Sequence, residues 1–370
     1  MDNSKIKVYV GMSGGVDSSL TAALLKEQGY QVVGVYMKNW SQDLPGMKCP
    51  WAEDLADAKR VAVQLGIDFK VFDFEKEYRE KVVQYMIDEY TSGRTPNPDI
   101  MCNQEVKFKL FLEAALEDGA DLIATGHYAG VKNKFTSHKD LGDDFNFSRS
   151  GAGELLRAKD KNKDQTYFLY RVRGEALGRT LLPLGEFTKP EVREMAKARG
   201  LFTARKKDSQ GICFVGKIGI RDFLKQFITE QKPGKIINKK TGEVLGWHDG
   251  AIFYTLGQRH GLNIGGGLPF YVCGKNMETN EVFVTTDLNT NELWTKEIKI
   301  SALHWINSAP RDGASIQIRV RHRAPLVEAK IFFDGDTACL QLENEQRAIT
   351  AGQSTVIYDG NVCLGGGIVI

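Results

Sequence analysis

The chain has 370 residues and a mass of about 41.3 kDa, which is more than one domain usually holds, so we expect two or three domains. Hydrophobic residues make up 42% and charged residues 26% of the chain. These ordinary values exclude a collagen, a coiled coil or a disordered chain as the description of the whole protein. The 49 Lys and Arg nearly balance the 47 Asp and Glu, so the net charge of +2 indicates no particular partner.

The sequence predicts a cytoplasmic protein without membrane contact. Its most apolar runs are far shorter than the roughly 20 residues that span a bilayer, and its polar start does not resemble a signal peptide. The six cysteines are not spaced as CxxC, and no HExxH occurs. We therefore expect neither a disulfide framework nor a structural zinc site.

Predicted strands and helices alternate through the first third of the chain. Short apolar runs predict strands at residues 6–10, 31–37, 69–72 and 121–124. Apolar residues at helical spacing predict helices at residues 17–29, 52–66, 76–90 and 105–118. This alternation predicts an α/β fold with a doubly wound parallel sheet. Ligands of such sheets bind at the carboxyl ends of the strands.

The pattern changes to short β-branched runs separated by glycine-rich turns. The predicted strands are residues 243–247, 251–255, 270–272, 282–285, 297–300, 316–320, 328–333, 338–342 and 354–358. We expect a catalytic domain over residues 1–210, a small central β-rich domain over 211–285 and a C-terminal β-barrel over 286–370. The polar residues 132–150 predict a long surface loop or hairpin.

Residues 11–19, which read GMSGGVDSS, lie between the first predicted strand and the first predicted helix. Glycines allow a tight turn there, and successive N–H groups at a helix N-terminus bind anions, so the run predicts a phosphate-binding loop. It has neither the lysine of a Walker loop nor a GxGxxG pattern. A helix capped by Ser13 or Asp17 would explain one or two of these residues but not the whole run. The predicted nucleotide-binding residues here are Gly11, Met12, Ser13, Gly14, Gly15, Val16, Asp17 and Ser18.

A second candidate site follows two prolines that fix the backbone in the segment TPNPDIMCN. Cys102 comes just before a predicted helix, whose dipole would favour the thiolate, and Asp99 could act as a general acid or base. Two simpler interpretations stay open. Asp99 could form an Asx turn, and Cys102 could be a small buried hydrophobic residue.

Cys213 is the third candidate, in the small and polar segment DSQGICF, which predicts a flexible loop. A mobile, accessible thiol is suited to sulfur transfer. Cys273, Cys339 and Cys363 lie in predicted strands and are expected in the core, and Cys49 is ambiguous.

Charge is unevenly distributed along the chain. Residues 205–240 contain ten Lys and Arg against three acids, an excess of seven positive charges, and a second basic cluster contains Arg319, Arg321, His322 and Arg323. Residues 51–120 contain fifteen acids and nine bases. A basic run is usually a solvated face, but it is also typical of nucleic-acid binding.

Several motifs occur in a fixed order: SGGVDSS, TPNPDIMCN followed by VKF, ATGHYA, KDQTYFLY, DSQGICFVG, and YTLGQRHGL with IGGG. The first resembles the loop of the PP-loop ATP pyrophosphatases, which have an adenine nucleotide alpha hydrolase-like fold. The whole series resembles the tRNA-specific 2-thiouridylases, over nearly the full chain. His260 is a departure, because this family is expected to have lysine in GQRKGL.

The resemblance implies ATP-dependent 2-thiolation of the wobble uridine, position 34, of tRNA. ATP would adenylate the C2 oxygen and release pyrophosphate, a persulfide on Cys213 would supply sulfur, and AMP would leave. Cys102 would assist by forming a disulfide with Cys213 or as a nucleophile, with Asp99 as the acid or base. Adenylation makes AMP the leaving group, which a sulfur nucleophile can displace if water is excluded.

The resemblance also implies the ligand contacts. Met37 and Gly126 would lie near adenine, although Gly126 could also be an ordinary glycine at a strand end, and Asp17 would help to hold Mg²⁺. The implied tRNA contacts are Asn97, Pro98, Asp99, Lys163, Asp164, Gln165, Arg321 and His322. The expected partners are tRNAs for Lys, Glu and Gln and a cysteine desulfurase or sulfur-relay protein, with the enzyme as a monomer.

Two other functions fit part of the sequence. Another PP-loop adenylating enzyme, such as a synthetase that uses ammonia, would leave Cys102 and Cys213 without a role. A non-catalytic RNA-binding sulfur carrier would leave the phosphate loop without one.

Overall fold

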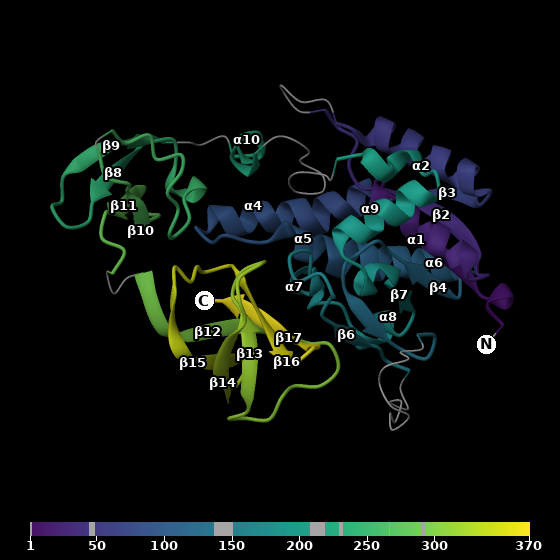
Figure 1. Ribbon diagram of the computed structural model, residues 1–370. Coiled ribbons are helices and arrows are strands. Elements are labelled where there is room, and N and C mark those ends of the chain that lie inside the picture. Colours follow the sequence, from purple (N-terminus) through teal and green to yellow (C-terminus); the bar gives the residue numbers. More distant parts are fainter. Residues whose placement is uncertain are drawn as a thin grey trace.

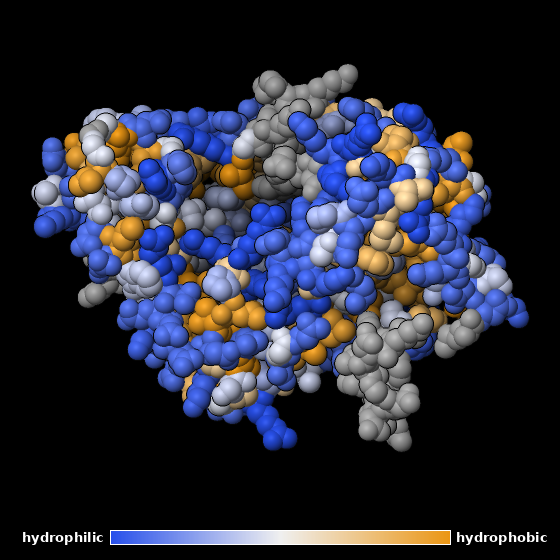
Figure 2. All heavy atoms as spheres, in the orientation of Figure 1, coloured by the Kyte–Doolittle hydropathy of each residue, from blue (hydrophilic) through white to orange (hydrophobic). Residues whose placement is uncertain are grey.

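The computed structural model describes residues 2–43, 49–136, 151–207, 219–228, 232–265, 267–289 and 293–370. An α/β part, a small β-sheet and a β-barrel lie beside one another (Figure 1). Hydrophilic residues cover most of the face in Figure 2, with hydrophobic patches between them. Within the described ranges, no helix has the length and hydrophobicity needed to cross a bilayer.

The expected doubly wound parallel sheet is confirmed. Its strands pair in the order β3 (Asp68–Asp73), β2 (Gln31–Lys38), β1 (Lys7–Gly11), β4 (Leu122–Ala124) and β7 (Thr180–Leu181), all parallel. Alternate side chains of β1 point to opposite faces. Val8 and Val10 pack with α1 (Val16–Glu27) and α2 (Trp51–Leu65), and Tyr9 packs with the helices of the other face.

The helices of this other face contain π-helical turns. One run consists of α3 (Glu75–Tyr78), η2 (Arg79–Val83) and α4 (Gln84–Thr91), and a second of α5 (Pro98–Met101), η3 (Cys102–Leu110) and α6 (Phe111–Glu117). Both predicted helices are therefore present, but the second begins at Pro98 instead of residue 105. Because π-helical turns are rare and occur often at functional sites, Cys102 at the start of η3 is in an unusual position.

The remaining short helices connect the strands. They are η1 (Asn3–Lys5), α7 (Thr166–Leu169), α8 (Gly174–Leu177), η4 (Pro183–Glu186), α9 (Lys189–Ala198), η5 (Phe202–Arg205), α10 (Ile220–Leu224) and η6 (Ala251–Phe253).

The central part contains a four-stranded sheet in the order β10 (Tyr271–Asn276), β11 (Glu281–Thr285), β8 (Gly234–Asn238) and β9 (Val244–His248). The prediction of a strand at residues 251–255 is wrong, because the 3-10 helix η6 occupies this position. Ala251 and Tyr254 are buried in the core beneath the small sheet. This apolar run therefore contributes side chains to the core although its backbone forms a turn instead of a strand.

The C-terminal part is the expected barrel. Its six strands are β12 (Trp294–Trp305), β13 (Ser315–Arg319), β14 (Val327–Asp334), β15 (Thr337–Arg347), β16 (Ser354–Asp359) and β17 (Val362–Val369), and pairing of β12 with β17 closes it. Strand β17 was not predicted, because its three glycines are atypical of a strand. A Cβ at Gly366 would come within 2.2 Å of the carbonyl oxygen of Thr355, so close packing requires glycine there.

The barrel sheet continues into the α/β part. Strand β6 (Glu154–Leu156) pairs with β17, and β5 (Gly130–Lys132) pairs with β6, which extends the sheet to eight strands. Segments about 200 residues apart in sequence therefore form one hydrogen-bonded sheet.

Buried histidines give the fold a predictable dependence on pH. The His127 ring is 8% exposed and its Nδ1 lies 2.8 Å from the Thr125 hydroxyl. Burial lowers its pKa well below the ordinary value, so the unfolded chain binds this proton first as the pH falls. We expect the free energy of unfolding to fall by up to about 1.4 kcal/mol per pH unit below pH 6.5 for this group. Urea unfolding at pH 7.5 and 5.5 measures the free energy of unfolding at each pH. If a folded His127→Gln variant loses the same free energy of unfolding between these pH values, His127 is not the group responsible.

Candidate nucleotide and tRNA site

The phosphate loop follows β1 and leads into the buried helix α1. Gly15 is the N-cap of α1, so the alternative of a cap by Ser13 or Asp17 is wrong. A glycine cap leaves space beside the first N–H groups of a 12-residue helix, where the dipole favours an anion. The Ser18 hydroxyl accepts a hydrogen bond of 3.1 Å from the Ser13 N–H and donates to the carbonyl of Gly15, which fixes the turn.

Close backbone contacts explain Gly14 and Gly126, and the Met37 side chain lies against Gly11. Gly14 has a φ of +72°, and a Cβ there would lie 2.5 Å from the carbonyl oxygen of Asp54. A Cβ at Gly126 would lie 2.9 Å from the Ser18 nitrogen, and one at Gly11 would lie 2.9 Å from the Met37 methyl group. Met37 and Gly126 therefore border the loop, as a shared nucleotide site requires.

A lysine that the sequence analysis did not identify lies at the loop. The Lys189 Nζ is 2.7 and 2.8 Å from the two carboxylate oxygens of Asp17, and the Tyr128 hydroxyl donates to Oδ1 at 2.8 Å. Lys189 is 9% exposed, whereas one third of the Asp17 side chain is exposed. A Walker loop contains its lysine within the loop sequence. Here the lysine beside the loop, Lys189, belongs to the distant helix α9.

The N-terminus of α9 holds Lys189 in place. Thr188 and Glu191 form a capping box, and the Thr188 N–H, the Thr188 hydroxyl and Lys159 together lower the pKa of Glu191 to about 2. The Lys189 N–H donates to Asp160 at 2.9 Å. The sequence TKPE indicates a helix start, but nothing in it indicates that this start faces residue 17.

The TPNPD segment places the candidate thiol in the core. The Asn97 side chain caps α5 by accepting from the Asp99 N–H at 3.2 Å, so the Asx turn forms at Asn97, and Pro98 occupies the first helical position. Asp99 is half-buried and Cys102 is 1% exposed. Such burial excludes bulk water from the thiol.

Aromatic stacking joins this segment to the barrel. The Asn103 amide donates to the carbonyl of Phe168 at 3.0 Å, and the Phe168 ring lies 4.4 Å from the His322 ring, centroid to centroid. Burial lowers the pKa of His322, and the neighbouring Arg321 donates to the carbonyl of Ala348. The structure therefore connects His322, a candidate tRNA contact of the barrel, through Phe168 to Asn103, the last residue of TPNPDIMCN.

The segment KDQ has a different environment from its expected one. Asp164 is 2% exposed and forms an ion pair of 2.9 Å with Arg319 on the outer face of the barrel strand β13, so its carboxylate is buried between the barrel and the α/β part instead of facing solvent. The Gln165 side chain accepts from the Tyr128 N–H at 2.8 Å. Lys163 is half-buried, and its backbone N–H donates a hydrogen bond to the Asp160 carboxylate.

Part of the basic sequence is neutralised by internal ion pairs. Lys206 lies 2.9 and 2.7 Å from Asp54 and Asp57, and Arg221 and Lys225 both contact Asp249. The local charge count therefore overstates the positive charge available to RNA. Cys213 lies outside the described residues, and His260 is exposed in the central part.

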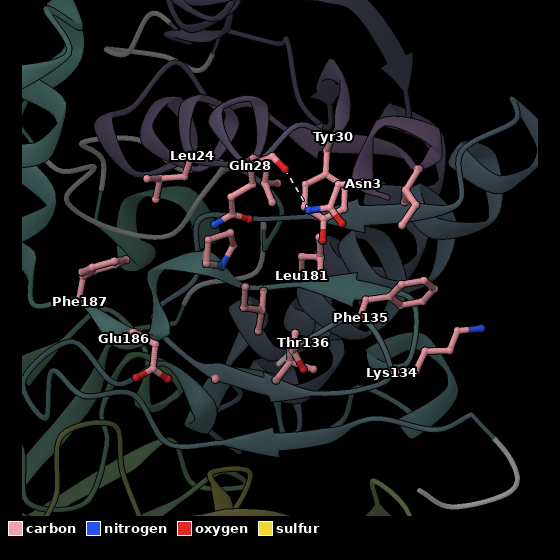
Figure 3. A pocket seen from close by; sticks show the side chains of 16 residues that line it. Asn3, Leu24, Gln28, Tyr30, Lys134, Phe135, Thr136, Leu181, Glu186 and Phe187 are labelled. Carbon is pink, nitrogen blue, oxygen red and sulfur yellow. Dashed lines mark hydrogen bonds between the residues drawn. The ribbon is translucent and has the colours of Figure 1, made fainter. Parts of the chain in front are cut away.

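A large cavity of about 640 Å³ lies elsewhere, beside the C-terminal end of α1 (Figure 3). Leu24, Gln28 and Tyr30 line one side and Phe135 and Thr136 the other. None of the predicted site residues lines it, so it is separate from the candidate nucleotide site at the opposite end of α1.

A lysine-free glycine loop at the carboxyl edge of a parallel sheet defines a PP-loop type of nucleotide-binding α/β domain. Family models match residues 6–217 (tRNA methyl transferase HUP domain), 221–286 (tRNA methyl transferase PRC-barrel domain) and 295–369 (aminomethyltransferase beta-barrel domain). The tRNA-specific 2-thiouridylase MnmA of Streptococcus sanguinis is 45% identical, covering 100% of this chain and 96% of the relative. The tRNA-specific 2-thiouridylase MnmA of Halalkalibacterium halodurans is 47% identical, covering 98% of this chain and 94% of the relative. The chain belongs to the tRNA-specific 2-thiouridylase family.

Solved structures with a similar fold include a 4-thiouridine synthetase in complex with RNA and ATP (18% identity, TM-score 0.37, 60% of this chain and 50% of that chain). Another is the U34-tRNA thiolase NcsA of Methanococcus maripaludis (16% identity, TM-score 0.36, 61% of this chain and 66% of that chain).

Proposed function

We propose that this chain catalyses the ATP-dependent 2-thiolation of uridine 34 in tRNA, forming 2-thiouridine, AMP and pyrophosphate. The observation that carries the proposal is that one chain of the thiouridylase family contains both the phosphate loop and the segment TPNPDIMCN, whose Asn103 is connected through Phe168 to His322 of the barrel. The reaction belongs in the cytoplasm, where its tRNA substrate is found.

The phosphate loop and Lys189 act on ATP. The N-terminus of α1 receives the phosphates, and the Lys189 ammonium moves from Asp17 to their negative charge. The partly exposed Asp17 carboxylate is an oxygen donor that fits Mg²⁺, which would neutralise phosphate charge there. The uridine C2 oxygen then attacks the α-phosphorus, and the bond to pyrophosphate breaks.

The two thiols transfer the sulfur. The terminal sulfur of a Cys213 persulfide forms a bond to C2, and the C2–O bond breaks to release AMP. Cys102 attacks Sγ of Cys213, the S–S bond breaks, and its electron pair forms the C2=S bond. The resulting disulfide must be reduced by an external thiol before the next turnover. The buried position of Cys102 supports this proposal, because water would hydrolyse the adenylate.

The remaining parts of the proposal concern partners. A cysteine desulfurase or a sulfur-relay protein loads Cys213, and the accepted tRNAs are those for Lys, Glu and Gln. A monomer binds one tRNA through Asn97–Asp99 at the base and through Lys163, Arg321 and His322 at the backbone.

One incubation tests the function. The protein is mixed with undermodified tRNA, ATP, Mg²⁺ and a persulfide donor, and 2-thiouridine and AMP are measured by mass spectrometry and chromatography. We expect both products in equal amounts. Absence of AMP would exclude an adenylating enzyme, and AMP without thiolation would favour a different nucleophile such as ammonia.

A further inference from the structure

We propose that Thr95 and Gln353 are positioning residues for the thiolation of uridine 34. They attach the start of the segment TPNPDIMCN to the barrel, so that a tRNA held by the barrel presents its target base to Asn97–Asp99. Neither residue touches the reacting atoms, and neither is among the predicted ligand contacts. The inference rests on the proposed function, because it takes Asn97–Asp99 as the contacts of the target base.

Thr95 is the residue at which three parts of the chain meet, between α4 and α5 (Figure 1). It is 9% exposed. Its N–H donates to the carbonyl of Ala351 at 3.0 Å, and the Gln353 side-chain amide donates to its carbonyl at 2.9 Å. Its hydroxyl lies 3.2 Å from the Thr255 hydroxyl of the central part. Every polar group of Thr95 therefore has a partner in the barrel or in the central part.

Close packing fixes the barrel side of this contact. Gly352, which lies between the two barrel residues that bind Thr95, has a φ of +87°, and a Cβ there would lie 2.7 Å from the Thr95 nitrogen. The Gly352 N–H donates to the carbonyl of Val369, and the Val369 N–H donates to the carbonyl of Gln353, both at 2.9 Å. The turn that holds Thr95 is therefore itself held by the last strand of the barrel, β17.

Few rotatable bonds separate Thr95 from the predicted base contacts. The bond from Gln353 orients the peptide group between Thr95 and Pro96, and the proline ring fixes the next φ at about −65°. Asn97 then has an extended backbone and caps α5, which begins at Pro98. The position of Thr95 therefore determines the position of the residues that receive the base.

This arrangement affects the rate of the reaction more than the affinity for tRNA. Adenylation and sulfur transfer both occur at C2 of one base, so both need that base at a fixed place beside Asn97–Asp99. Arg321 and His322 hold the tRNA on the same barrel that carries Gln353, and they keep this role when the bond to Thr95 is lost. A displacement of about 1 Å at the reacting base is enough to lower a rate by about 100-fold.

The test compares the single-turnover rate of 2-thiouridine formation at saturating tRNA with the tRNA dissociation constant, using the persulfide-loaded full chain. Gln353→Met keeps the size of the side chain and removes the donor. We expect it to lower the rate by at least about tenfold and to change the dissociation constant by less than about twofold. The matched control is Gln341→Met, at an exposed position of β15, which should leave both quantities within about twofold of those of the unchanged protein.

Two substitutions of Thr95 provide an independent measurement. Thr95→Val removes only the hydroxyl that faces Thr255 and should lower the rate by at least about fivefold, whereas Thr95→Ser keeps the hydroxyl and should restore the rate to within about twofold. A thermal melt of each variant shows that the protein is folded at the assay temperature. If Gln353→Met does not fold, the two Thr95 variants decide.

A folded Gln353→Met variant with a normal single-turnover rate would overturn the proposal, because the bond would then only stabilise the fold. A normal rate at saturating tRNA with a weakened dissociation constant would also overturn it, because Gln353 would then act in binding. Equal rates for Thr95→Val and Thr95→Ser would exclude a positioning role of the hydroxyl. Failure of the proposed function is distinct, because the unchanged protein would then form no 2-thiouridine.

Discussion

Replacing Lys189 with alanine is expected to lower the rate of tRNA-dependent AMP formation by at least about 100-fold, the cost of removing one preorganised charge that stabilises a transition state. The buried ammonium contacts both oxygens of Asp17 and is the cation placed at the loop from α9. Without it, the loop would lose this positive charge beside the phosphates. The tRNA dissociation constant without nucleotide should change by less than about twofold, because Lys189 is at the nucleotide site.

The matched control is Lys197→Ala on the same helix. Lys197 is 64% exposed and forms a surface pair with Glu194, so its loss should leave AMP formation within about twofold. Product is measured by chromatography of AMP at saturating tRNA. Nearly unchanged AMP formation in the Lys189→Ala variant would show that the loop binds phosphate without this lysine.

Replacing either reactive cysteine with serine is expected to reduce 2-thiouridine formation by about 1,000-fold or more, because a hydroxyl neither carries a persulfide nor accepts a disulfide. Release of pyrophosphate should persist in both variants, because adenylation of the uridine precedes the sulfur transfer that releases AMP. Cys213→Ser should also lose the persulfide, and Cys102→Ser should retain it. Mass spectrometry of the loaded protein and of digested tRNA separates these results.

Cys339→Ser is the control for loss of a thiol elsewhere. Cys339 lies on β15 of the barrel, and burial raises the pKa of its thiol, so it is a poor nucleophile. This variant should thiolate tRNA at the normal rate. Full thiolation by Cys102→Ser would remove Cys102 from the chemistry and leave its burial as a packing role.

Local sequence patterns were sufficient for the parallel sheet and the phosphate loop. Both depend on neighbouring residues, such as β-branched runs for β1 and β2 and glycines for the turn before α1. The same reasoning failed at residues 251–255, because apolar residues fill the core of the small sheet from a 3-10 turn as well as from a strand. Periodicity does not separate these two cases over five residues.

The missing parts of the site depend on contacts between distant residues. Lys189 is 172 residues from Asp17, and no spacing rule connects them. Asp164 is between two polar residues in KDQ, a pattern typical of an exposed loop, and only the fold shows that Arg319 buries it. The burial of Cys102, in contrast, was one of two interpretations that the sequence left open.

The pairing of β6 with β17 has a consequence for synthesis of the protein. Leu155 pairs with Cys363, which the ribosome adds about 200 residues later. The parallel sheet can form early, but β6 lacks one of its two neighbouring strands until β17 has been synthesised. A nascent chain released early, or cut after the central domain, would therefore expose an unpaired strand edge and lack Arg319, the partner of Asp164. The strand that closes the barrel therefore also completes the sheet to which β5 and β6 of the α/β part belong.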